Sequence, residues 1–229
     1  MQVTDEAIIL SIKAHTENSK IFQYLTKGNG IFSGFVRNAQ KKHGYITEGS
    51  KITTHWKARL EEQIGTLKYE PISGNSFNFL FDKEKSISIS CLLQIISSSF
   101  PERQHIDGLF DLLENYIISL KESPFDFIKY INAELEILKL SGYELILDKC
   151  GHTGNTSDLA YVSPKTGRAI SKEAGEEYKH KLLPLPNFQE MNKRNNIINS
   201  LNLTGYFFDR YIYRNSKKNL PKIRELLAQ

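Results

Sequence analysis

The spacing of apolar residues divides the chain into a first part that alternates and a later part with helical repeats. Before residue 75, apolar and β-branched residues alternate or cluster in five short segments, a pattern typical of half-buried strands. The turn Lys27-Gly-Asn-Gly predicts a hairpin between the second and third. Five short strands favour a small closed OB-type barrel, although an SH3-like barrel has a similar strand count. The predicted strands cover residues 6–15, 20–26, 31–36, 50–58 and 64–72.

From about residue 76 the apolar residues recur at helical spacing. Pro124 is a residue type that opens helices, and Gly142 is one that ends them. The sequence therefore predicts an α+β fold, with the barrel in residues 1–80 and a mostly helical domain in residues 81–229. The clearest predicted helices cover residues 106–120, 124–141, 187–202, 204–213 and a short segment from Pro221.

A turn-rich segment at about 148–172 interrupts the helical part and resembles a zinc ribbon. A structural zinc site needs four ligands, usually in two closely spaced pairs. Cys150 and His152 could supply one pair, but Thr153 stands where a second thiol would be, and 163–171 contains neither Cys nor His. We therefore expect a zinc-ribbon-like insertion without most of its metal ligands, and no zinc or other cofactor. Hydrogen bonds from turn side chains can hold such a segment instead.

Charge is segregated along the chain, although the net charge is only +4. Residues 1–80 carry ten Lys and Arg against seven Asp and Glu, and residues 150–229 carry thirteen against seven. The middle, 81–149, is acidic, with twelve Asp and Glu against seven Lys and Arg. This pattern indicates two basic surfaces, since clustered cations attract polyanions. The simpler alternative is that these charged residues form ordinary solvent-exposed faces, which differ in the sign of their charge but bind no polyanion.

Composition points to a cytoplasmic protein with no membrane association. Two cysteines cannot form a disulfide framework. No apolar run approaches the ~20 residues that a membrane span requires. The N-terminus also lacks the features of a signal peptide.

Recognisable catalytic chemistry is absent from the sequence. The six histidines are scattered, and neither a phosphate-binding loop nor a dinucleotide-binding fingerprint is present. A nuclease would need a carboxylate cluster for a metal. The adjacent pair Glu61 and Glu62 is the nearest candidate, and it more simply forms a solvated turn.

Nucleic-acid binding is the chemistry that the basic residues favour. Barrels of this class bind single strands through a basic groove and through aromatic rings that stack on bases. Here the cations are interleaved with Phe32, Phe35, Tyr45, His55 and Trp56, although barrel core is an equally good assignment for Phe35 or Trp56. A basic run at a helix end could contribute a second surface or simply cap the helix. The candidate DNA-binding residues are Lys20, Lys27, Arg37, Lys41, Lys42, Lys57, Arg59, Arg210, Arg214, Lys217 and Lys218.

Three stretches give the chain a resemblance to a known family. They are the basic strand from Gly34 to Lys42, the segment from Gly142 to Ser171, and the ending that begins Leu203-Thr-Gly-Tyr-Phe-Phe-Asp-Arg-Tyr. Together they resemble the RecO recombination-mediator family of bacterial DNA repair over essentially the whole length. Trp56-Lys-Ala-Arg-Leu is similar to the alphaproteobacterial branch.

The resemblance implies an N-terminal OB barrel and a helical C-terminal domain with a zinc-ribbon-like insertion. It also implies a non-enzymatic mediator that binds single- and double-stranded DNA and anneals complementary strands. With RecR as partner, such a mediator helps RecA onto DNA coated by single-strand-binding protein, whose acidic C-terminal tail is a further expected partner. Many members carry four zinc cysteines, of which this sequence keeps only Cys150. An interaction adaptor with weak DNA contact is the alternative function.

Overall fold

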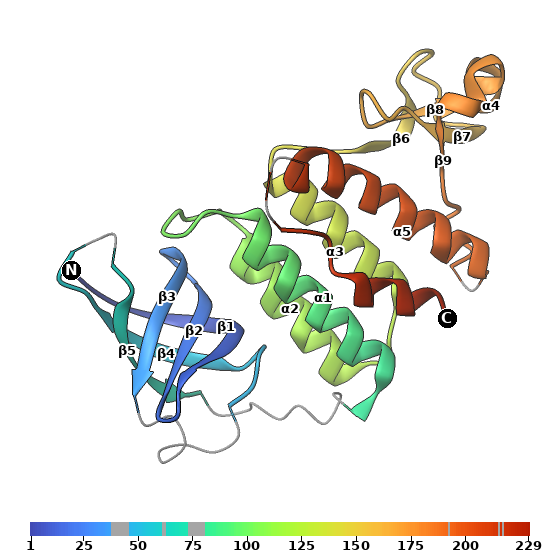
Figure 1. Cartoon of the computed structure of the whole chain (residues 1–229). Coiled ribbons are helices and arrows are strands. Elements are labelled where there is room, and N and C mark those ends of the chain that lie inside the picture. Colours follow the sequence, from blue (N-terminus) through green and yellow to red (C-terminus); the bar gives the residue numbers. More distant parts are fainter. Residues whose placement is uncertain (38–45, 61–62, 73–80, 192, 215, 217) are drawn as a thin grey trace. The chain divides into compact units, whose positions relative to one another are not determined.

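The computed structural model describes the chain except for residues 38–45, 61–62, 73–80, 192, 215 and 217. It contains two compact units, Met1–Pro124 and Phe125–Gln229, each of which is described by itself (Figure 1). The first unit holds a barrel and two helices. The second holds the helices α3 (Phe127–Leu140) and α5 (Arg194–Phe208), several shorter helical segments and a small sheet.

Five strands form a closed barrel in the first unit. Their order is β1-β2-β3-β5-β4, and β1 closes the barrel by pairing with both β2 and β4. This α+β fold with a closed, OB-type barrel confirms the predicted fold class. The strands are β1 (Gln2–Thr16), β2 (Ser19–Thr26), β3 (Gly30–Arg37), β4 (Lys51–Lys57) and β5 (Gly65–Pro71).

Alternation along the strands explains the barrel core. Every second side chain points inward, which buries the rings of Phe22, Tyr24, Phe32 and Trp56. Burying one such side chain stabilises the fold by about 1.5–3 kcal/mol. Trp56 is 1% exposed, and its Nε1 donates a hydrogen bond of 3.0 Å to the carbonyl of Ser33. Trp56 and Phe32 are therefore core residues, which removes them from the aromatics available for base stacking.

The seam between β3 and β5 depends on glycine. Gly34 pairs with Gly65 across this seam. A Cβ atom at Gly65 would lie 2.3 Å from the Trp56 ring, and one at Gly34 would lie 2.6 Å from the Leu67 Cβ. Both distances are shorter than van der Waals contact allows, so side chains at these positions would push the strands apart.

Arg103, which follows the first helix, adds a contact to the same part of the barrel. Its backbone has a left-handed φ of 63°, and its N–H donates a 2.8 Å hydrogen bond to the carbonyl of Ile31. The guanidinium lies 5.4 Å from the Trp56 ring centre and donates a hydrogen bond to the carbonyl of Gln63. A cation over an aromatic face is attracted by the ring quadrupole. The residues after the helix therefore help to hold the barrel.

Two helices, α1 (Lys83–Ser99) and α2 (Leu109–Glu122), complete the first unit. The Asp82 side chain caps α1 by accepting a hydrogen bond from the backbone N–H of Lys85. The buried face of α1 packs against β1. Lys51 forms ion pairs with Glu6 at 2.9 Å and Glu114 at 2.6 Å, so this basic residue of the first part is neutralised by neighbouring acids.

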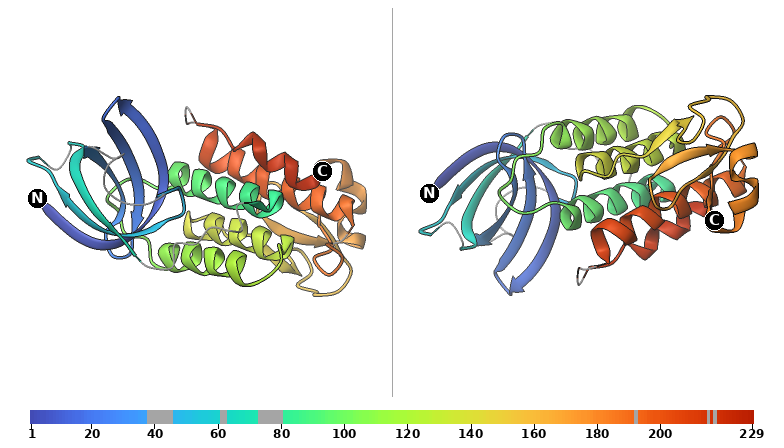
Figure 2. Two further views of the ribbon diagram at one scale, coloured as in Figure 1. Left: turned by 90° about the horizontal axis from the view of Figure 1, so that it is seen from below. Right: turned by 90° about the horizontal axis from the view of Figure 1, so that it is seen from above.

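The second unit is built around helices α3 and α5, which run side by side (Figure 2). A four-stranded sheet in the order β6-β8-β7-β9 forms from the turn-rich segment. Its zinc-ribbon likeness stays a prediction. The elements are α3 (Phe127–Leu140), β6 (Ile146–Cys150), β7 (Leu159–Val162), β8 (Arg168–Ser171), α4 (Lys172–Gly175), η2 (Glu176–Lys181), β9 (Leu183–Pro184), α5 (Arg194–Phe208), the π-helical η3 (Asp209–Tyr213) and η4 (Lys222–Ala228).

A buried ion pair fastens the C-terminal segment to these helices. Glu134 of α3 is fully buried and accepts hydrogen bonds of 2.6 and 2.7 Å from the guanidinium of Arg224, which is 4% exposed. Thr204 of α5 donates a further hydrogen bond of 2.6 Å to the same carboxylate. Three elements thus share one charge pair, and removing one partner would leave a charge buried without compensation.

The predicted domain boundary at residue 80 falls outside the described residues and stays a prediction. By compactness, α1 and α2 group with the barrel in the first unit. Among the described residues, no helix has the length and apolar character needed to cross a membrane.

Candidate nucleic-acid interface

Strand register brings an aromatic ring and cations together on the outer surface of the barrel. Phe35 of β3 pairs with Thr66 of β5, and Thr66 pairs with Lys57 of β4. All three alternate with inward residues such as Trp56 and therefore point outward. Neighbouring strands lie about 4.8 Å apart, which places the backbones of Phe35 and Lys57 about 10 Å apart.

The same outward row extends across β2 to β1. Lys13 pairs with Ile21, and Ile21 pairs with Phe35. Arg37 is exposed and lies two residues after Phe35, so it projects from the same side of β3. The ring of His15 packs edge-on against Phe35, with ring centres 4.6 Å apart and planes at 76°. We call Lys13, His15, Phe35, Arg37 and Lys57 the barrel face.

The cations of the barrel face are available to an external anion. Within the part of the chain that the structure describes, no carboxylate forms an ion pair with Lys13, Arg37 or Lys57. This situation contrasts with that of Lys51, which two carboxylates hold. Positive groups without internal partners can bind the phosphates of a polyanion.

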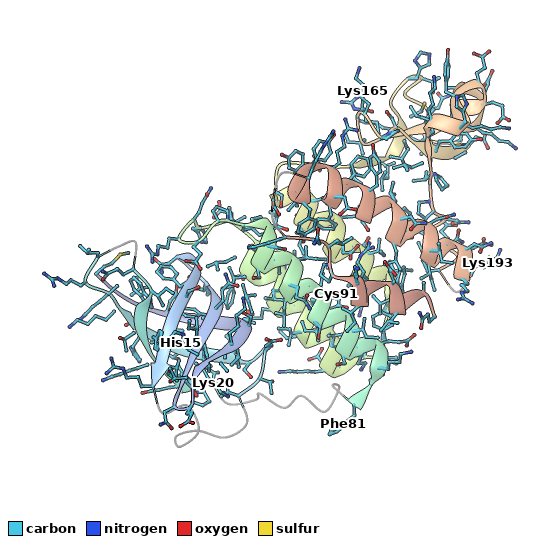
Figure 3. The ribbon with its side chains drawn as sticks, in the orientation of Figure 1. His15, Lys20, Phe81, Cys91, Lys165 and Lys193 are labelled. Carbon is cyan, nitrogen blue, oxygen red and sulfur yellow. The ribbon has the colours of Figure 1, made fainter. Side chains whose placement is uncertain are left out.

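Other predicted residues of the first unit lie elsewhere or outside the described residues. Lys20 of β2 pairs with Ala14 of β1 and with Val36 of β3, and it alternates in step with the inward residues Phe22 and Tyr24. Its side chain therefore leaves β2 on the side opposite to the barrel face. Figure 3 labels Lys20 and His15 on the barrel. Lys27 lies in the hairpin turn at the far end of the eight-residue β3, about 25 Å from Arg37. Arg59 is exposed just after β4. Lys41, Lys42 and Tyr45 lie outside the described residues. All of these remain predictions.

Lys13 and His15 were missed as members of this face. Their sequence neighbourhood is not basic, and a local pattern cannot show which strands become neighbours. The signal that could have found them is their outward alternation on the first predicted strand, combined with an assumed hairpin register to the second.

A second basic surface lies at the end of α5 and in η3. Arg210 donates a hydrogen bond of 2.9 Å to the Tyr206 hydroxyl, and its guanidinium lies 5.5 Å from the centre of the Tyr211 ring. The hydrogen bond with Tyr206 raises the pKa of Arg210. Arg214 and Lys218 are exposed nearby in the chain, and Lys217 lies outside the described residues. Arg210, Arg214 and Lys218 are thus close to one another in the sequence.

The buried thiol of Cys150 accepts hydrogen bonds from two backbone N–H groups. Backbone N–H groups of Thr153 and Ser171 point at its Sγ at 3.5 and 3.3 Å. Burial raises the pKa of this thiol, but hydrogen bonds from Thr153, Ser171 and His152 outweigh it and bring the pKa to about 6. Among the described residues, no three His, Cys, Asp or Glu side chains are grouped so that they could hold a metal. The arrangement explains how the turn is stabilised by hydrogen bonds.

The fold and the barrel face together define an OB-barrel protein with a helical second unit and a basic outer surface. Comparison with known proteins gives the family. The model of the family described as Recombination protein O matches in both parts, its N-terminal part over residues 1–75 and its C-terminal part over residues 80–221. The chain belongs to the RecO family.

Curated relatives agree with this assignment over the full length. A protein of Rickettsia bellii named DNA repair protein RecO is 38% identical over 234 residues, covering 100% of this chain and 96% of the relative. A protein of the same name from Orientia tsutsugamushi is 39% identical over 236 residues, covering 100% and 97%. These relatives confirm the predicted resemblance to the RecO family.

Proposed function

We propose that this chain is a non-enzymatic mediator of DNA repair and recombination that binds single- and double-stranded DNA. The barrel face is the observation that carries the proposal, because it presents cations that form no ion pair with any described carboxylate, beside an outward aromatic ring. Such a surface binds phosphates electrostatically and tolerates any base sequence. Membership of the RecO family supports the same function.

The proposed mechanism of strand annealing is electrostatic. Two complementary strands repel each other because both are polyanions, and a protein that neutralises phosphates on each lowers this barrier. The barrel face would hold one strand, and the surface around Arg210, Arg214, Lys217 and Lys218 would hold the other. Base pairing then supplies the driving force, so no nucleotide hydrolysis and no cofactor are required.

The proposed partners follow from the family. We expect RecR to act with this chain in helping RecA onto DNA coated by single-strand-binding protein, in the cytoplasm and at the nucleoid. The acidic C-terminal tail of single-strand-binding protein would bind an apolar and basic surface of the second unit.

An interaction adaptor with weak DNA contact is the second candidate function. A groove of about 560 Å³ between α5 and the C-terminal segment favours it, since Leu201, Leu220 and Pro221 line it together with Lys222. Grooves of this size accept peptide side chains. Strand annealing by the purified chain alone would decide against the adaptor.

Fluorescence anisotropy of a labelled single strand across a salt series tests the proposal. Replacing Arg37 and Lys57 together with Ala should weaken binding and reduce the salt slope by about 1.4, since each phosphate contact contributes about 0.7 on single strands. Lys83→Ala is the control, because Lys83 is an exposed cation of the same unit that is neither part of the barrel face nor among the predicted DNA-binding residues. Affinity of the double variant within twofold of wild type at low salt would refute the barrel face.

A further inference from the structure

Aromatic rings stack from the core of the second unit to its surface at the end of α3. The Tyr143 and Tyr211 rings are nearly parallel, with planes at 9° and centres 4.3 Å apart. Tyr211 also stacks against Phe207, with planes at 14° and centres 6.0 Å apart. Phe207 is fully buried, whereas Tyr143 is 36% exposed. The series of rings therefore ends at a ring that solvent reaches.

Local backbone structure fixes the exposed ring. Gly142 ends α3 with a left-handed φ of 90°. Its N–H donates a 2.8 Å hydrogen bond to the carbonyl of Lys139, and the N–H of Tyr143 donates one of 2.8 Å to the carbonyl of Leu138. These two hydrogen bonds are those of a Schellman motif. Tyr143 is thus held by the helix end, so little conformational entropy would be lost when a ligand stacks on it.

The opposing ring belongs to an irregular helical turn. Tyr211 lies in η3, a π-helical continuation of α5. Single π-helical turns inside α-helices are frequently found at functional sites. Here the turn carries both Tyr211 and Arg210, the cation that lies over the Tyr211 ring.

The segment that carries Tyr211 is rich in positive charge in its sequence. Residues 209–222 contain five Lys and Arg and a single acid, Asp209. Arg210 lies over the ring itself, and Arg214 is exposed one turn later. Glu144, which follows Tyr143 in the chain, is neutralised by an ion pair with Lys139 at 3.1 Å. A ligand here would need both a flat ring and a negative backbone, which is the chemistry of a nucleotide chain.

We propose that Tyr143, Tyr211 and Arg210 form a base-stacking platform for single-stranded nucleic acid in the second unit. This inference rests on the proposed function and deepens it. An unpaired base would extend the series of rings on Tyr143, while its phosphates meet Arg210 and Arg214. Stacking on aromatic rings tolerates every base, because each has a π-face. Bases in a duplex are already stacked, so the platform selects single strands.

Photocrosslinking of the wild-type chain tests the platform without any mutation. On irradiation, the C5–iodine bond of 5-iododeoxyuridine breaks, and C5 forms a new carbon–carbon bond to an aromatic side chain that stacks on the base, with loss of iodide and of one ring hydrogen as a proton. After trypsin cleavage we expect adducts on Tyr143, in the peptide 140–149, or on Tyr211. Adducts confined to the first unit would overturn the inference and leave the proposed function intact.

Substitution at the exposed ring gives an independent measurement. We expect Tyr143→Leu to weaken binding of oligothymidine about fivefold or more, because base stacking on a ring contributes at least about 1 kcal/mol. It should also abolish the quenching of a 2-aminopurine base that stacks at this site. Tyr143→Phe keeps the ring and should behave as wild type.

Tyr178→Leu is the matched control, since Tyr178 is 55% exposed in the same unit but lies in η2. An equal loss in Tyr143→Leu and Tyr178→Leu, or no loss in either, would overturn the platform. If the wild-type chain binds no single strand, the proposed function fails first and the platform with it.

Discussion

The two basic surfaces present their cations in different ways. On the barrel face, Lys13, Arg37 and Lys57 come from three strands and are spaced by the register of the sheet. In the second unit, Arg210 lies on an aromatic ring and within one helical segment. This difference suggests that the two surfaces bind different parts of a nucleic acid. A lattice of separate cations suits phosphates, whereas a cation coupled to stacked rings suits bases, and the two surfaces should respond differently to salt.

The largest expected effect comes from removing one partner of the buried ion pair that joins α3, α5 and the C-terminal segment. Arg224→Ala would leave Glu134 buried without its partner and should lower the free energy of unfolding by about 3–5 kcal/mol. Urea unfolding followed by circular dichroism measures this loss. The double variant Glu134→Leu with Arg224→Met removes both charges and should recover most of it. Equal stability of Arg224→Ala and wild type would contradict the role of this pair.

A smaller loss is expected when the barrel seam is widened. Gly65→Ala places a Cβ atom against the Trp56 ring and should cost about 1–3 kcal/mol through overpacking. The same urea titration detects it. Gly28→Ala, whose added Cβ atom would come no closer than 3.4 Å to a carboxylate oxygen of Asp5, is the control that separates crowding from the general effect of replacing glycine. The seam assignment fails if Gly65→Ala is as stable as wild type.

Salt dependence should separate the two surfaces most directly. Arg37→Ala with Lys57→Ala should reduce the slope of log affinity against log salt by about 1.4. Tyr143→Leu should lower affinity while leaving that slope within experimental error of wild type, because no cation is removed. Anisotropy titrations at several salt concentrations give both quantities. The proposed difference between the surfaces disappears if both variants change the slope equally.

The smallest expected effect concerns the thiol of the turn-rich segment. Its pKa of about 6 lies below the ordinary value of 9.0. The thiolate therefore stabilises the fold fully above pH 9, and this contribution disappears as pH falls through about 6. Thiolate absorbance at 240 nm should rise with a midpoint near pH 6, and Cys150→Ser should lack this step. A midpoint near pH 9 would contradict the assignment.

Local pattern predicted the elements of the barrel well, because each strand has one buried and one exposed side. Inward Phe22 and Phe32 alternate with outward residues, and that period can be read from the sequence alone. The barrel face could not be predicted in this way, because it depends on which strands become neighbours. Phe35 meets Lys57 only through the pairing of β3 with β5, which joins segments whose neighbourhood no local pattern specifies.

Contacts between residues far apart in the chain could not be predicted from the sequence either. Arg103 reads as one more cation of an acidic stretch, yet its left-handed backbone turns its guanidinium toward Trp56. Glu134 sits on the apolar face of a predicted helix, where its burial depends on a partner 90 residues away. The stack of Tyr143 on Tyr211 is similarly remote. Each depends on tertiary packing, which single-sequence patterns do not encode.

The paired glycines of the β3–β5 seam couple the inside of the barrel to its outside. Gly34 and Gly65 admit the Trp56 ring beneath them, and the very next residues on both strands, Phe35 and Thr66, belong to the outward row. The size of the buried Trp56 indole therefore limits how closely β3 and β5 approach each other, and so determines the distance between Phe35 and Lys57 on the outer surface. Replacing Trp56 with a residue that has a smaller ring would change the spacing of the outward cations, although no surface residue is substituted.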